Sequence, residues 1–86
     1  MNNPKTIKVT VRSFVPPLEP IDAYELGRPF QTNARAGITL GEFAQRVLSE
    51  NINLLGLKAV NGRLAKEDTV LADGDKIDLF AAIDGG

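Results

Sequence analysis

Residues 71–86 decide the fold of this chain, and they read Leu-Ala-Asp-Gly-Asp-Lys-Ile-Asp-Leu-Phe-Ala-Ala-Ile-Asp-Gly-Gly. Asp73-Gly74 is typical of a turn, and Lys76 to Phe80 alternates polar and apolar residues, which predicts a strand. That strand runs directly into residues 81–86, which we expect to form a flexible tail. Because glycine has no Cβ atom, a final Gly85-Gly86 pair can stay extended and enter a channel too narrow for side chains.

The residues before this stretch predict a hairpin and a helix. Asn61-Gly62 favours the type I′ turn of a two-residue hairpin, so we expect strands over 57–60 and 63–66. Thr39 and Glu42 form the capping-box pattern Thr-x-x-Glu, which places a helix start near Thr39. The following apolar residues recur at helical spacing and predict one face packed on a sheet, with the helix continuing to Asn51; they are Leu40, Phe43, Ala44, Val47 and Leu48.

The N-terminal third predicts two more strands. Ile7, Val9 and Val11 alternate with polar residues, as in a half-buried antiparallel strand. Prolines and a glycine interrupt the pattern from Phe14 to Pro29, so this region should be irregular. Residues 30–36 can return as a second strand with Phe30, Thr32 and Ala34 on one face. The order strand, strand, helix, strand, short strand, strand indicates a mixed sheet with one covering helix.

The composition of the chain argues against several classes of function. The chain has 86 residues, which corresponds to a single domain over 1–86. A net charge of -1 argues against nucleic-acid binding. The sequence has no apolar run of membrane-spanning length and no signal-peptide pattern, so we expect a soluble cytoplasmic protein without a membrane partner. The absence of Cys and His removes most self-contained catalytic machinery, and we expect that the chain is not an enzyme on its own.

Taken together, these motifs resemble the ubiquitin-like sulfur-carrier family of β-grasp proteins. The resemblance rests on Val60-Asn61-Gly62, on Leu71 before Asp73-Gly74-Asp75, on Ile77 with Leu79-Phe80, and on the final Gly85-Gly86. Close members are the small subunit of molybdopterin synthase and the thiamine-pathway sulfur carrier. The resemblance implies an α+β, ubiquitin-like β-grasp fold, in which one main helix covers one face of a mixed sheet of four to five strands.

The resemblance also implies a reaction at Gly86. An E1-like activating enzyme would use ATP and Mg²⁺ to adenylate the Gly86 carboxylate, and a sulfur donor would convert it to a thiocarboxylate. The chain itself would bind no cofactor. Length and the Leu79-Phe80 ending favour molybdopterin (or tungsten-cofactor) biosynthesis, with the large subunit of a molybdopterin synthase as acceptor. The alternatives are thiamine or tRNA thiolation, a protein modifier conjugated through Gly86, and an interaction module with a passive tail.

Four further residues near the chain end are candidates for partner binding. Gly85 would accompany Gly86 into the partner's active site, and Asp84 could pair with a basic groove or remain a solvated charge. Phe80 alternates away from Ile77 and Leu79, which places its ring outside the main core, and it is either a docking anchor or a packing residue; Ile83 leaves the same choice. Three nearby aspartates, Asp73, Asp75 and Asp78, do not match an EF-hand spacing, and we predict no metal site.

Overall fold

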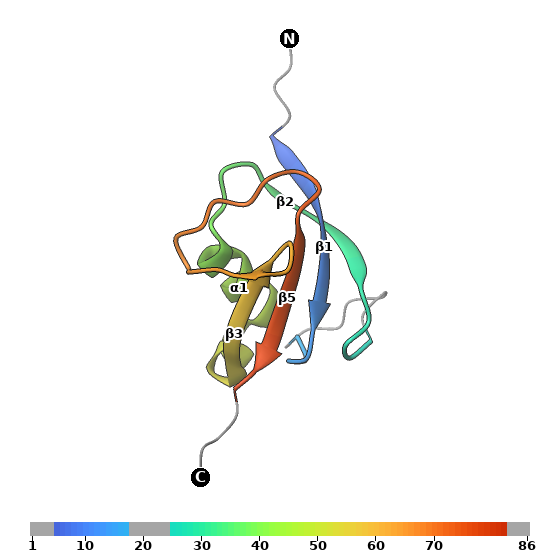
Figure 1. Ribbon diagram of the computed structural model, residues 1–86, viewed down its shortest axis with the longest axis vertical. Helices are drawn as coiled ribbons and strands as arrows, with labels where there is room; N and C mark the ends of the chain where they lie inside the picture. The colour runs from blue at the N-terminus through green and yellow to red at the C-terminus, as the bar shows by residue number, and fades with distance from the viewer. Residues whose placement is uncertain (1–4, 18–24, 83–86) are drawn as a thin grey trace.

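The computed structural model describes residues 5–17 and 25–82 and shows a twisted sheet with one helix packed on it (Figure 1). The elements in chain order are β1 (Thr6–Ser13), β2 (Phe30–Arg35), α1 (Leu40–Leu48), the 3₁₀ helix η1 (Ser49–Leu54), β3 (Leu55–Val60), β4 (Arg63–Leu64) and β5 (Lys76–Ala81). This order of strands and helix confirms the order expected from the sequence.

The five strands form one mixed sheet with the order β2-β1-β5-β3-β4. β1 is antiparallel to β2, as expected, and it is also parallel to β5, so the N-terminal and C-terminal strands lie side by side in the centre of the sheet (Figure 1). β3 is antiparallel to both β5 and β4. The predicted α+β, ubiquitin-like β-grasp fold is therefore confirmed.

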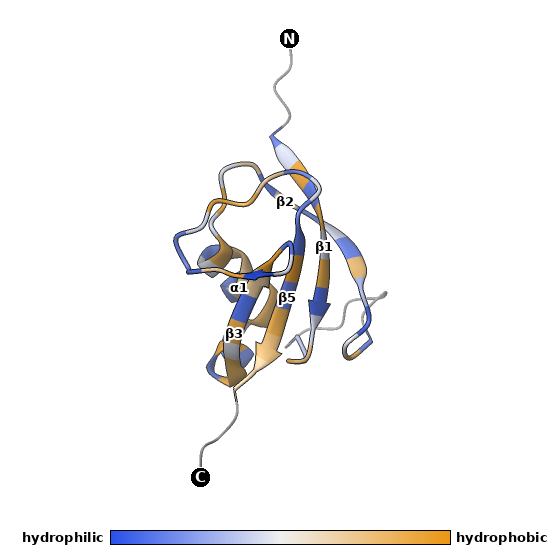
Figure 2. Ribbon diagram, viewed as in Figure 1, coloured by the Kyte–Doolittle hydropathy of each residue, from blue (hydrophilic) through white to orange (hydrophobic). Residues whose placement is uncertain are grey.

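The core lies between the sheet and α1. Apolar and polar residues alternate along β5 (Figure 2), and Ile77 and Leu79 are 1% and 0% exposed, which confirms that they face inward. Val9 and Val11 of β1 are buried beside them, as their alternation predicts. The helix contributes Leu40, Phe43, Ala44 and Leu48 to the same cluster, with Val47 half-buried at its edge. Removing one such buried leucine side chain typically costs about 2–5 kcal/mol of stability.

The start of α1 is fixed by the predicted capping box. The Glu42 backbone N–H donates to Thr39 Oγ1 over 3.2 Å, and the Thr39 backbone N–H donates to Glu42 Oε1 over 3.1 Å. The Thr39 hydroxyl also donates to Glu42 Oε1 over 3.2 Å. The two bonds that the Thr39 backbone N–H and hydroxyl donate to the carboxylate lower the pKa of Glu42 below its ordinary value of 4.5, with smaller contributions from Arg35 and Arg46. The charged carboxylate also lies in the first turn, where the helix dipole favours it.

The end of α1 differs from the expected one. The α-helix stops at Leu48, and the chain continues to Leu54 as a 3₁₀ helix, so the predicted continuation to Asn51 is wrong. Ser49 has a φ of 49°, which lies outside the range of a right-handed helix. Ser and Asn have low helix propensities, which favours an early end of the α-helix at Ser49, Asn51 and Asn53. The Asn51 side chain donates to the Pro16 carbonyl over 2.9 Å and ties this segment to the end of the first loop.

The Asn61-Gly62 turn has the geometry that the dipeptide predicts. Both residues have positive φ, 54° and 84°, as a type I′ turn requires. Asn61 also joins this turn to the start of β5, because its Nδ2 donates to Asp75 Oδ1 over 2.9 Å and its Oδ1 accepts from the Lys76 backbone N–H over 3.0 Å. The strand after the turn is only two residues long, which is shorter than the predicted 63–66.

The region from Phe14 to Pro29 is irregular in its described parts, 14–17 and 25–29, while 18–24 lie outside the described residues. Gly27, at a φ of 72°, donates its N–H to the Ser13 carbonyl over 2.8 Å. A Cβ atom on Gly27 would lie 2.7 Å from the Phe14 ring, so this loop contacts Phe14 closely. β2 then begins at Phe30, as expected, and Thr32 and Ala34 share its inward face.

Within the described part of the chain, no helix has the length and apolar character needed to cross a membrane.

Candidate functional site

The candidate site lies where β5 ends. Gly86, Gly85, Asp84 and Ile83 all lie outside the described residues, so the structure places only the base of the predicted tail. Ala81 is the last residue of β5, and the Ala82 backbone N–H donates to the Leu54 carbonyl over 2.8 Å. The first two residues of the predicted tail, Ala81 and Ala82, are thus bonded into the sheet and its border, while the rest of that prediction, 83–86, lies outside the described residues.

A β-bulge in β3 shapes the base of the tail. Leu55 pairs with Ala81 and Lys58 pairs with Leu79, so Gly56 and Leu57 together oppose the single residue Phe80. A Cβ atom on Gly56 would lie 2.8 Å from the Ala82 Cα atom and 3.2 Å from the Ala81 carbonyl oxygen. Only glycine lets the two backbones approach this closely, so Gly56 fixes where the chain leaves the sheet.

Phe80 lies on the face of the sheet opposite to α1, where alternation predicts it. It is half-buried, because its ring stacks on Phe14 with centroids 5.7 Å apart and ring planes 9° apart. The Arg12 guanidinium lies over the Phe14 ring at 5.6 Å, and Arg12 Nε donates to Asp78 Oδ1 over 3.0 Å. Phe80 thus packs on Phe14 while part of it stays exposed, and its role as a docking anchor stays a prediction.

An apolar groove runs along this base. It has a volume of about 640 Å³ and is lined by Phe14, Gly56, Leu57, Phe80, Ala81 and Ala82, a set that we call the tail-base groove. Leu57 is 62% exposed and Phe14 is 38% exposed, although both are large apolar side chains. Exposed apolar patches of this kind are typical of protein-docking sites.

Sequence reasoning found Phe80 but missed Phe14, Gly56 and Leu57. Phe14 comes beside Phe80 because β1 and β5 are parallel neighbours, and its N–H donates to the Leu79 carbonyl over 2.8 Å. A usable signal was present, since Phe14 continues the polar-face alternation of Thr10 and Arg12. The glycine within an otherwise strand-like stretch was a second signal, because such glycines mark bulges and close backbone approaches.

The three aspartates in and before β5 have hydrogen-bonding roles in the fold. Asp73 accepts the Lys8 backbone N–H over 2.8 Å, and Asp75 accepts the Ala72 backbone N–H over 2.8 Å. Asp78 is paired with Arg12. Among residues 5–17 and 25–82, no group of three or more Asp, Glu, His or Cys side chains is placed to hold a metal ion.

Fold and surface together define a ubiquitin-like β-grasp protein with an apolar groove at the base of its C-terminal segment. The family model described as the ThiS family matches residues 27–86. The chain belongs to this family of ubiquitin-like sulfur carriers. A search of curated protein sequences gives no match.

Three solved structures illustrate the similarity. The Haloferax volcanii HVO 2177 protein is 15% identical, with a TM-score of 0.68 over 100% of this chain and 92% of that one. A ubiquitin of Caldiarchaeum subterraneum is 20% identical, with a TM-score of 0.61 over 94% of this chain and 99% of that one. A chain from the complex of subunits 1 and 2 of the molybdopterin-converting factor of Helicobacter pylori 26695 is 29% identical, with a TM-score of 0.53 over 93% and 100%.

Proposed function

We propose that this protein carries sulfur on the Gly86 carboxylate and donates it from a C-terminal thiocarboxylate. The observation that carries the proposal is the fixed tail base. The Ala82 bond to Leu54 and the close approach at Gly56 hold the chain where residues 83–86 begin, beside the apolar tail-base groove. A partner that docks on this groove receives the chain end in a defined direction. Membership of the ThiS family supports the same role.

The chemistry requires activation by another protein. A carboxylate oxygen of Gly86 attacks the α-phosphorus of Mg²⁺-bound ATP, and pyrophosphate leaves as the acyl-adenylate forms. A hydrosulfide equivalent from the sulfur donor then attacks the acyl carbon, AMP leaves and the thiocarboxylate remains. Both ATP and Mg²⁺ belong to an E1-like activating enzyme, and this chain binds no cofactor of its own. Because the chain contains no Cys, no internal thiol competes for the activated acyl group.

We assign the pathway to molybdopterin or tungsten-cofactor biosynthesis in the cytoplasm. The support is the similarity to a chain of the molybdopterin-converting factor complex, at 29% identity over the full length of that chain. On this proposal, the acceptor is the large subunit of a molybdopterin synthase, and the carrier is a consumed co-substrate that is recharged after each transfer. It is not itself an enzyme.

Each partner-binding residue has a separate role in this proposal. Phe80, held by Phe14, offers its exposed ring edge as the docking anchor, and Ile83 extends the apolar contact toward the tail. Asp84 pairs with a basic groove of the partner. Gly85 and Gly86 then pass through the narrow part of the active site, where any Cβ atom would collide with the walls.

The experiment is a reconstitution with the activating enzyme of the same organism, ATP, Mg²⁺ and sulfide. Pyrophosphate release that requires Gly86 and is lost in a variant without Gly85-Gly86 supports activation at the tail. Sulfur transfer to a pterin precursor by the large synthase subunit supports the molybdopterin branch, whereas transfer to a thiazole precursor or a tRNA contradicts it. A ladder of protein conjugates without any thiocarboxylate would instead identify a protein modifier.

A further inference from the structure

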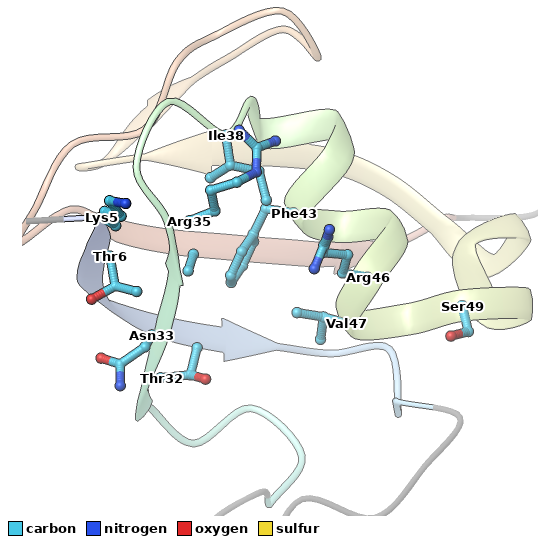
Figure 3. Close-up of a pocket in the computed structure, with 11 residues that line it drawn as sticks. Lys5, Thr6, Thr32, Asn33, Arg35, Ile38, Phe43, Arg46, Val47 and Ser49 are labelled. Atoms are coloured by element: carbon cyan, nitrogen blue, oxygen red, sulfur yellow. The ribbon is translucent and has the colours of Figure 1, made fainter.

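A second groove lies between the edge strand β2 and α1 (Figure 3). It has a volume of about 580 Å³ and shares no lining residue with the tail-base groove. Its apolar floor includes Ala34 of β2 together with Phe43 and Val47 of α1. Figure 3 shows the Phe43 ring between the helix and β2, with Val47 beside it. This size and floor suit the side chains of a short peptide segment.

The rim of this groove is basic, although the whole chain has a net charge of -1. It is lined by Lys5, which precedes β1, by Arg35 of β2 and by Arg46 of α1. Arg35 is partly neutralised, since its Nη2 lies 3.5 Å from Glu42 Oε2. Within residues 5–17 and 25–82, Lys5 and Arg46 form no ion pair. The groove therefore favours an anionic occupant by charge complementarity.

The strand beside the groove has an open edge. β2 is the outermost strand of the sheet and pairs only with β1 among the described residues. Ala36 donates its N–H to the Lys5 carbonyl across the pair over 2.9 Å, and antiparallel pairing alternates, so Arg35 and Asn33 direct their backbone N–H and C=O groups away from β1. The Arg35 carbonyl accepts the Ile38 N–H over 3.1 Å, which leaves the Arg35 N–H and both backbone groups of Asn33 at the edge. These groups form a template on which another extended chain can pair.

We propose that this groove binds an extended segment of a partner protein, in which apolar residues are flanked by Asp or Glu. The segment pairs with the open edge of β2 as a sixth strand. Its alternate apolar side chains lie on Phe43 and Val47, and its acidic residues pair with Arg46 and Lys5. This mode of binding obtains affinity from backbone bonds and specificity from alternate side chains. Because the two grooves are separate, such a partner can bind while the tail occupies an active site.

The test uses a synthetic peptide with alternating valine and isoleucine residues, flanked by aspartates, titrated into the ¹⁵N-labelled full-length protein. The largest changes in backbone amide chemical shift are expected at Arg35, at Asn33 and on the exposed side of α1. Exchanging the flanking aspartates for lysines should weaken binding at least about tenfold, which corresponds to roughly 1.4 kcal/mol. Arg46→Glu should weaken it similarly. The matched control Arg63→Glu, on β4 at the far edge of the sheet, should leave binding unchanged.

Backbone pairing is tested separately with two N-methylated peptides. In an extended chain, successive backbone N–H groups point to opposite edges. One peptide is therefore N-methylated at its odd positions, which blocks one edge, and the other at its even positions, which blocks the opposite edge. One peptide should bind normally and the other should not. The proposal is overturned if the acidic peptide causes no shifts at millimolar concentration or if both methylated peptides bind equally. It is also overturned if inorganic pyrophosphate alone displaces the peptide, since the groove is then a site for small anions.

Discussion

Phe14, just after β1, stacks on Phe80 of β5 with ring centroids 5.7 Å apart. Two residues before each ring, Arg12 pairs with Asp78, although 66 positions separate them in the sequence. The stack joins the start and the end of the chain on the sheet face opposite to α1. It holds Phe80 in one orientation before any partner arrives, and a preordered aromatic ring loses little side-chain entropy on docking.

The first prediction concerns this stack. Phe80→Ala should reduce the rate of adenylation by the activating enzyme about tenfold or more, because the substitution removes a docking anchor of hot-spot type. Phe14→Ala should have a smaller effect in the same direction, since it frees Phe80 without removing it. The measurement is pyrophosphate release against carrier concentration. Val70→Ala, at an exposed apolar residue outside the tail-base groove, serves as the control without effect.

The same two residues should be coupled in stability. Stacked aromatic pairs contribute about 0.5–1.5 kcal/mol beyond the area they bury. A double-mutant cycle by urea unfolding should therefore give a coupling free energy in that range for Phe14→Ala and Phe80→Ala. Strictly additive effects of the two substitutions would show that the rings do not support one another.

Gly56→Ala should impair adenylation of the tail in a variant that still folds. The new Cβ atom would lie 2.8 Å from the Ala82 Cα atom, so the tail base must move away from the bulge. The loss in the rate of adenylation, expressed as a free energy, should exceed the loss in the free energy of unfolding. The control is Gly62→Ala, which is strained by its φ of 84° and costs about 1 kcal/mol but has no atom within 4 Å of the new methyl group. Equal losses of adenylation in both variants would contradict a positioning role for Gly56.

Asn61→Ala should be among the more damaging surface substitutions. It removes the side-chain bonds to Asp75 and Lys76 and places alanine at a φ of 54°. Together these changes should lower the free energy of unfolding by about 2–3 kcal/mol. Chemical denaturation measures the loss. Asn61→Gly, which relieves the backbone but not the bonds, should fall between this variant and the wild type.

The helix cap predicts a pH dependence. The pKa of Glu42 is below 4.5 because of hydrogen bonds from Thr39, so the stability that its ionised form contributes is present above about pH 4.5. It is lost as the pH falls through the lowered pKa of the folded state. In Thr39→Ala, an NMR titration should show the pKa of Glu42 moving up toward 4.5. Alanine keeps the backbone N–H at position 39, so the pKa should not reach 4.5, and an unchanged pKa would show that the Thr39 hydroxyl does not contribute to the shift.

The sequence predicts the parts of the fold that depend on local chemistry. The capping box located the start of α1, Asn61-Gly62 specified the turn geometry, and alternation identified the buried residues of β5. Each of these features depends on residues within one turn or strand of each other. The early end of α1 at Ser49 was missed because helix propensities are small, and packing against the rest of the protein determines where a helix ends.

The candidate site was less predictable because it is assembled across strands. Phe14 meets Phe80 through the parallel pairing of β1 with β5, and Gly56 meets Ala82 through a bulge that shifts the register of β3. The alternation of polar and apolar residues within one strand does not determine which strand it pairs with or in which register. The sequence did identify Phe80 as an outward-facing ring, which is the part of the site that alternation alone determines.

The most direct test of the sulfur-carrier role is the intact mass of the protein purified from its own cells, with fragmentation to locate the change. Exchange of one oxygen for sulfur adds nearly the same mass as oxidation of Met1, so the fragment that contains Gly86 must be resolved. We predict a thiocarboxylate on Gly86. An unmodified Gly86 that also stays unmodified with activating enzyme, ATP and sulfide would contradict the proposed function.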